Sequence, residues 1–143
     1  MRLYKNIFGL LFCFVLLFNY SAIAQCDIPE EYNWNTGINM TIMLTPSFIG
    51  DLPITDEDAY MVLLNEAGQV FGSECVSYNC LGDQAQTAIS AWGDDSFTNE
   101  IDGFLSGETL SWQLVDGDYI FDVYPEFMIG NSSYVSNGVM VAT

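Results

Sequence analysis

The stretch ETLSWQLVDGDYIFDVY, residues 108–124, is the strongest indication of fold class in this sequence. Apolar residues alternate with other residues on both sides of an Asp-Gly pair at positions 116 and 117. The alternating apolar residues are Leu110, Trp112 and Leu114 before that pair and Tyr119, Phe121 and Val123 after it. A period of two is typical of a strand with one buried face, and Asp-Gly favours a tight hairpin turn. We therefore expect two antiparallel strands joined at Asp116 and Gly117.

Similar strand patterns occur along the rest of the chain. Residues 59–77 predict a second hairpin, in which Gly68 suits a turn position with positive φ. Single strands are expected at 38–44, 87–92 and 132–143. The segment 45–58 contains two prolines, a glycine and an acidic cluster, which indicates a connecting loop.

These patterns predict an all-β fold. Six or seven short strands separated by turn signals, without a convincing amphipathic helix, are typical of a β-sandwich. We expect a single antiparallel β-sandwich domain of about six or seven strands over residues 37–143, preceded by an entry arm or linker at 25–36.

The N-terminus has the pattern of a secretory signal peptide. Arg2 and Lys5 precede an apolar run at 7–18, and a small residue, Ala22, stands two positions before a second one, Ala24. The run is shorter than the roughly 20 residues of a membrane span, so we expect cleavage after residues 1–24 and no membrane insertion. The strand-like end at 139–143 is interpreted as a sign that the chain is a fragment of a longer protein.

The mature part of the chain is expected to carry no positive side chain. Both cationic residues lie in the signal segment, and all 19 Asp and Glu residues follow it, which gives a formal charge of −19 and no histidine. A chain without cations cannot neutralise a phosphate backbone, and anionic membrane surfaces repel it. A chain without His or Lys also cannot use Ser–His or Cys–His catalytic pairs, Schiff bases or imidazole metal sites.

The cysteines predict a small disulfide loop. Cys13 leaves with the signal peptide, and export favours oxidation of the remaining three. Cys75 and Cys80 are close enough in sequence to pair. Cys26 then either pairs outside this chain or competes for one of the other two, while a metal site built on Cys75 and Cys80 lacks further ligands.

An acidic stretch at 92–108, WGDDSFTNEIDGFLSGE, offers three interpretations. The first is a calcium site, because Ca²⁺ takes six to eight oxygen ligands, although the spacing is not that of an EF-hand. The candidate ligands are Asp94, Asp95, Glu100, Asp102 and Glu108, with Thr98 or backbone carbonyls. The second is a turn in which carboxylates accept backbone N–H bonds, while Phe97, Ile101 and Phe104 tuck into the core. The third is a catalytic pair of carboxylates formed by Glu100 and Glu108.

Aromatic residues provide a further candidate site. Trp34, Trp92 and Trp112, together with the eight tyrosines, would form a glycan-stacking platform if their rings were exposed and coplanar. Aromatic residues on strands are more often part of a core.

The acidic stretch also carries a resemblance. The stretch matches a sequence pattern with a GDD, DGF and GE core. The matching residues are Gly93, Asp94, Asp95, Thr98, Asp102, Gly103, Phe104, Gly107 and Glu108. Together with YNWNTGINMTIML earlier in the chain, residues 32–124 resemble a module of large secreted and cell-surface proteins of Bacteroidetes. The strand EDAYMVLL departs from the form common in such modules. The resemblance implies a β-sandwich within a multidomain exterior protein and fixes no activity.

The sequence therefore predicts a secreted or cell-surface module that is not an enzyme. The leading hypothesis is a structural or adhesive module whose partners are other domains of the same protein, with Ca²⁺ as the one candidate cofactor. The alternative is a calcium-dependent carbohydrate-binding module that contacts extracellular glycans.

Overall fold

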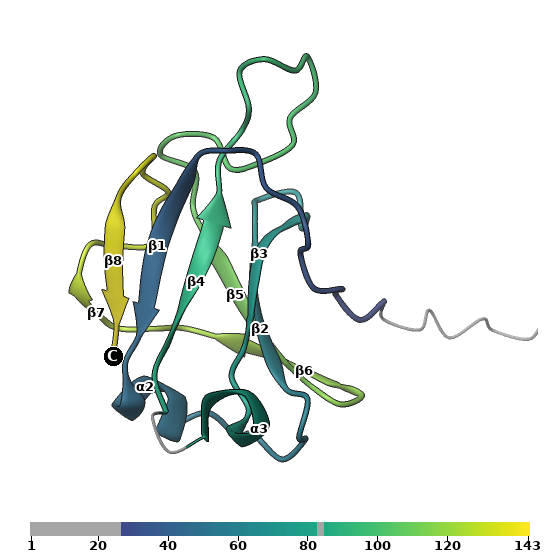
Figure 1. Cartoon of the computed structure of the whole chain (residues 1–143), viewed down its shortest axis with the longest axis vertical. Coiled ribbons are helices and arrows are strands. Elements are labelled where there is room, and N and C mark those ends of the chain that lie inside the picture. The colour runs from purple at the N-terminus through teal and green to yellow at the C-terminus, as the bar shows by residue number, and fades with distance from the viewer. Residues whose placement is uncertain (1–26, 83–84) are drawn as a thin grey trace, which may run out of the picture.

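The computed structural model describes residues 27–82 and 85–143, which form two packed four-stranded sheets (Figure 1). The first sheet has the order β4 (Thr87–Trp92), β1 (Asn39–Leu44), β8 (Val139–Ala142) and β7 (Phe127–Ile129). The second has the order β3 (Val70–Cys75), β2 (Tyr60–Leu64), β5 (Ser111–Asp116) and β6 (Tyr119–Val123). The predicted all-β sandwich is confirmed.

Two details of the sheets differ from the expectation. The described residues form eight strands, because the short strand β7 pairs with β8 at the edge of the first sheet. The neighbours β1 and β8 run parallel, with Ile42 opposite Met140, whereas the other strand pairs are antiparallel. Alternation along a strand predicts which face is buried and does not predict which strand lies beside it.

The core lies between the two sheets. Met40, Ile42 and Leu44 of β1 alternate inward and belong to one buried cluster with Met61 and Leu63 of β2. Burial of each such side chain contributes roughly 1.5–3 kcal/mol relative to exposure. The apolar side chains that alternate in the sequence therefore stabilise the packing of the two sheets.

The two sheets approach each other closely along one side of the sandwich and are joined by a chain crossover along the other. On one side β3 and β4 come close at Gly72, where an added Cβ would lie 2.6 Å from the backbone oxygen of Ser90. A glycine inside a strand often marks such a close approach. On the other side the chain crosses from β6 to β7 through Tyr124, Pro125 and Glu126, and a cleft lies beside this crossover.

In the described part of the chain, two short helices lie in the connections between strands. Helix α2 (Pro46–Gly50) occupies part of the segment expected to be a loop, and the hydroxyl of Thr45 caps it by accepting a bond from the Phe48 backbone at 3.3 Å. Proline suits the first turn of a helix, and Phe48 is buried. Helix α3 (Tyr78–Leu81) follows β3 and contains Cys80.

The expected entry arm is attached to the sandwich along 29–36. The Tyr32 backbone N–H donates to the hydroxyl of Ser73 at 2.8 Å, and the Tyr60 hydroxyl donates to the carbonyl of Pro29 at 2.7 Å. Thr36 donates to the Gly93 carbonyl at 2.6 Å. The signal segment 1–24 and Cys26 lie outside the described residues. Within the described ranges, no helix has the length and apolarity needed to cross a membrane.

Candidate functional site

The acidic stretch leaves the end of β4 and projects beyond the sheets as a long loop at the top of Figure 1. Its base is closed by backbone hydrogen bonds between the two ends of the excursion. The Asp94 N–H donates to the Phe104 carbonyl at 3.0 Å, and the Phe104 N–H donates to the Trp92 carbonyl at 2.8 Å.

The carboxylates of this loop accept bonds from its backbone. Asp94 accepts the Asp102 N–H at 3.1 Å, and Asp102 accepts the Asp95 N–H at 3.0 Å. Asp95 accepts the Phe97 N–H at 2.8 Å, and Glu108 accepts the Leu105 N–H at 2.9 Å. These contacts are those expected of a hydrogen-bonded turn, although the pair of Asp94 and Asp102 spans more residues than a local turn.

Glycine is required where the two sides of the loop meet. A Cβ on Gly103 would collide with the backbone of Gly93, and a Cβ on Gly93 would collide with the hydroxyl of Tyr134. The ring of Tyr134 also stacks on Phe104, with centroids 5.6 Å apart. The loop base is thus packed too tightly for any side chain at positions 93 and 103.

Only one of the three expected apolar anchors reaches the core. Phe104 is buried, whereas Phe97 is 95 % exposed and Ile101 is 58 % exposed. The expectation that Phe97 and Ile101 tuck into the core is therefore wrong. Hydrogen bonds to Asp94 and Asp102 hold this part of the loop instead, so its apolar side chains are free to face solvent.

The candidate calcium ligands do not converge on one point in this geometry. In residues 27–82 and 85–143, no group of three or more Asp, Glu or Cys side chains is placed to hold a metal ion. Four of the five candidate carboxylates accept hydrogen bonds from the loop itself, and Glu100 is exposed. Calcium binding therefore stays one of the three interpretations of this loop that the sequence offers.

The predicted disulfide between Cys75 and Cys80 is confirmed. It joins the end of β3 to helix α3, with the two Cα atoms 6.1 Å apart, within the usual range for a disulfide. Such a bridge is typical of proteins that fold in an oxidising compartment.

The three tryptophans lie in different parts of the molecule. Trp34 is 77 % exposed on the entry arm, and Trp92 is partly buried at the end of β4. Trp112 on β5 is only 4 % exposed and packs against Phe48 and Phe127, each with ring centroids 6.2 Å away. The structure places them on separate elements, and Trp112 alone of the three lines the cleft beside the crossover from β6 to β7.

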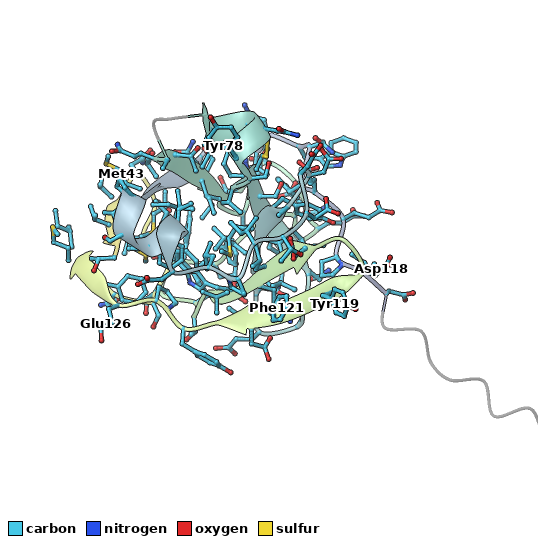
Figure 2. The ribbon with its side chains drawn as sticks, turned by 90° about the horizontal axis from the view of Figure 1, so that it is seen from below. Met43, Tyr78, Asp118, Tyr119, Phe121 and Glu126 are labelled. Carbon is cyan, nitrogen blue, oxygen red and sulfur yellow. A yellow bond between two sulfur atoms is a disulfide. The ribbon has the colours of Figure 1, made fainter. Side chains whose placement is uncertain are left out.

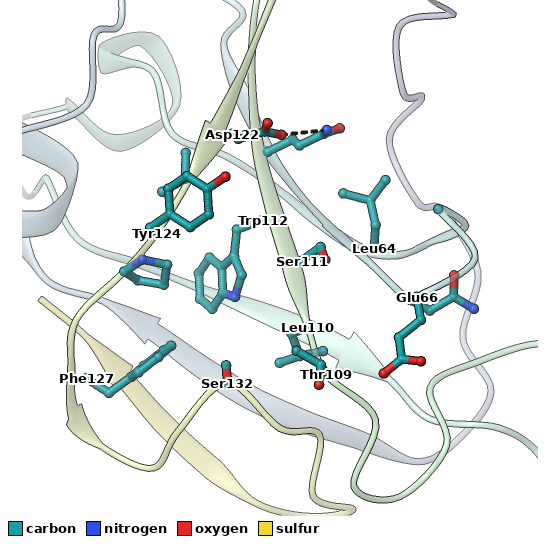
Figure 3. Close-up of a pocket in the computed structure, with 15 residues that line it drawn as sticks. Leu64, Glu66, Thr109, Leu110, Ser111, Trp112, Asp122, Tyr124, Phe127 and Ser132 are labelled. Atoms are coloured by element: carbon teal, nitrogen blue, oxygen red, sulfur yellow. Dashed lines mark hydrogen bonds between the residues drawn. The ribbon is translucent and has the colours of Figure 1, made fainter.

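A cleft of about 680 Å³ lies beside the crossover from β6 to β7 (Figure 3). Its volume is within the range of small-ligand sites in proteins. The turn between β2 and β3 forms one wall, the first residues of β5 form the floor, and the crossover forms the other wall. The residues that line it include Glu66, Ser111, Trp112, Gln113, Asp122 and Tyr124.

The cleft combines aromatic surface with polar groups. Tyr124 is 88 % exposed at its rim, whereas Trp112 is buried, and its indole N–H finds no acceptor among the described residues. The Gln113 amide donates to the Asp122 carboxylate at 2.9 Å, the dashed line in Figure 3. Buried donors without acceptors are uncommon in proteins. The site therefore offers one ring for stacking and several groups for hydrogen bonding.

Of these cleft residues, Trp112 was a named sequence-based candidate, and Tyr124 was included only as one of the eight tyrosines. The signal for Tyr124 was present, because Pro125 cannot donate to a strand ladder, and β6 ends at Val123, just before the tyrosine. Nothing local indicated that Gln113 and Asp122 would lie side by side in a cleft, since this depends on the register of β5 against β6.

Among the residues that the structure describes, two carboxyl groups outside the loop have shifted pKa values. Burial alone would raise the pKa of Asp116, but hydrogen bonds from Thr55 and Asp56 outweigh it and hold this pKa below its ordinary value. Burial raises the pKa of Glu74 against an opposing bond from the Cys75 backbone, and the negative charge of Glu31 raises it further. Neither group lines the cleft, so both bear on stability and not on a reaction there.

Comparisons of the chain with protein-family profiles, curated proteins and solved structures gave no match. The resemblance of residues 32–124 to a module of exterior proteins stays a prediction.

Proposed function

We propose that this chain is a non-catalytic extracellular module that acts by contact, as a structural or adhesive part of a larger surface protein. The observation that carries this proposal is a disulfide-linked β-sandwich whose described part contains no Lys, Arg or His. Such a chain cannot use the catalytic mechanisms that need Lys or His, and its acidic surface favours solubility outside the cell.

The carboxylates of the molecule support contact over catalysis. A glycosidase needs one carboxyl group that burial keeps protonated beside one that is ionised. Glu66 and Asp122 of the cleft are both exposed, so burial does not supply this difference between them. In the acidic loop, Glu100 is exposed and Glu108 accepts a bond from its own loop.

Carbohydrate binding is a second candidate, favoured by one specific observation. The cleft places exposed Tyr124 beside an amide, a carboxylate and hydroxyl groups, a combination suited to stacking on a sugar ring and bonding to its hydroxyls. In this candidate, the partners are extracellular glycans. In the leading one, they are neighbouring domains of the same protein.

The test exposes the full exported chain to an array of extracellular glycans and assays the same glycans for released reducing ends. Retention without any release supports a contact module that binds glycans, and no retention on any glycan supports the structural or adhesive module. Release of reducing ends that is lost in Asp122→Asn or Glu108→Gln would contradict both candidates, because it would show that the chain cleaves what it holds.

A further inference from the structure

We infer that the cleft between Trp112 and Tyr124 binds an uncharged oligosaccharide and does so without calcium. This inference rests on the second candidate function and adds to it the place of the site, the class of glycan and the independence from metal. It also moves the predicted glycan contact from three tryptophans to one tyrosine at the rim of a cleft.

The shape of the surface around Tyr124 fits a chain of sugars better than a single sugar. A second hollow of about 410 Å³ lies beside the same crossover, and Val123, Tyr124 and Pro125 line both hollows. The exposed Tyr124 ring therefore stands on a ridge with a hollow on either side. An extended ligand that crosses the ridge can stack one ring on Tyr124 and place its neighbours in the two hollows.

The polar groups of the cleft suit hydroxyl groups of a sugar. The Asp122 carboxylate has acceptor capacity beyond its bond to Gln113, and Ser111 is exposed on the neighbouring strand β5. Trp112 also lines the cleft, although its side chain is buried on the opposite face of β5 from Ser111, and its indole N–H has no acceptor among the described residues.

The charge of the site selects against acidic glycans. Glu66 and Asp122 bring negative charge into the cleft, and no residue after position 5 is Lys, Arg or His. A uronic acid or a sulfated sugar would have its anion placed beside carboxylates with no cation to pair with it. An uncharged glycan avoids this repulsion and needs only stacking and hydrogen bonds.

Calcium has no part in this site. The residues that line the cleft include none of the five candidate calcium ligands of the acidic loop. Chelation of divalent ions should therefore leave glycan binding unchanged, in contrast to the calcium-dependent module that was the alternative hypothesis from the sequence.

The test titrates the full exported chain with cellopentaose, xylopentaose, mannopentaose and N-acetylchitopentaose by calorimetry, with EDTA present. Pentagalacturonate and deacetylated chitopentaose serve as the anionic and cationic comparisons. We expect at least one neutral pentasaccharide to bind, with EDTA without effect and pentagalacturonate not bound. Tyr124→Ala should weaken binding about tenfold or more, because the stacked ring contributes most of the contact.

Tyr119→Ala is the matched control, since Tyr119 is a second exposed tyrosine of this region and does not line the cleft. Tyr119 begins β6, and Figure 2 shows it well away from Glu126, which lies in the crossover after that strand. This variant should bind like the wild type. The inference is overturned if no neutral pentasaccharide binds, if only the charged ones bind, if EDTA abolishes binding, or if both tyrosine variants behave alike.

The outcomes separate this inference from the proposed function. Hydrolysis of a bound pentasaccharide would contradict the non-catalytic module while leaving the binding site intact. A complete lack of binding would overturn the site and leave the structural or adhesive module standing.

Discussion

The buried carboxylate of Asp116 accepts hydrogen bonds from the backbone N–H and the hydroxyl of Thr55, at 2.9 and 2.6 Å. The Asp56 N–H adds a third bond at 2.7 Å. The contact ties the segment before β2 to the hairpin of β5 and β6, 61 residues away in the chain. The described residues contain no cationic side chain, so the Asp116 carboxylate is stabilised by backbone N–H groups and not by a salt bridge.

Removal of this carboxylate should destabilise the fold. Asp116→Ala leaves the Thr55 and Asp56 donors without their acceptor, and we expect a loss of about 2–4 kcal/mol in the free energy of unfolding. Thr55→Ala removes only the hydroxyl bond and should cost about 1–2 kcal/mol. Urea unfolding of both variants at neutral pH measures the difference. Equal stability of Asp116→Ala and the wild type would contradict this assignment.

The same carboxylate should make stability depend on pH. Its pKa in the folded protein lies below the ordinary value of 3.8, so its contribution is fully present above that value. The contribution is lost as the pH falls through the lower folded pKa. The difference in unfolding free energy between wild type and Asp116→Asn should therefore be constant at neutral pH and shrink below about 3.8. A difference that grows on acidification would show that the pKa is raised.

The acidic loop should be held by its own hydrogen bonds. Asp102→Ala removes the acceptor for the Asp95 N–H and should cost about 1–3 kcal/mol, whereas Asp102→Asn keeps an amide oxygen there and should cost less. Melting curves in calcium chloride and in magnesium chloride of equal ionic strength should coincide, since both ions screen the acidic surface alike. A rise specific to calcium that Asp94→Asn and Asp102→Asn abolish would establish the calcium site instead.

Gly103 should not tolerate a side chain. Gly103→Ala places a methyl group against the backbone of Gly93, and we expect a loss of at least about 2 kcal/mol. Gly50→Ala is the control, because nothing lies within 4 Å of a Cβ at that position and it should change stability by no more than about 0.5 kcal/mol. Thermal unfolding of the two variants separates crowding from a general effect of replacing glycine. Similar behaviour of both would mean that the loop base can open.

The parts of the fold that depend on neighbouring residues were predictable from the sequence. The turn at Asp116 and Gly117 and the alternation around it predicted the hairpin of β5 and β6, and the spacing of Cys75 and Cys80 predicted the disulfide. In each case the partners are close in the chain, so the local pattern carries the information.

Features that depend on distant partners were missed for the converse reason. Strand β7 has three residues and exists through its pairing with β8, and the parallel pair of β1 and β8 joins segments almost a whole domain apart. The cleft arises where the crossover at Tyr124 passes the start of β5. Residue types predicted that the acidic loop would bond to itself, but not that Phe97 would face solvent.

The most direct test of contact through the cleft uses the indole N–H signals of Trp34, Trp92 and Trp112 in a ¹⁵N-labelled chain, titrated in turn with cellopentaose, xylopentaose and mannopentaose. The account predicts that at least one of these sugars shifts the Trp112 signal, leaves that of exposed Trp34 unchanged and is recovered uncleaved. A Trp112 signal that none of the sugars moves, or a shift confined to Trp34 or Trp92, would contradict it.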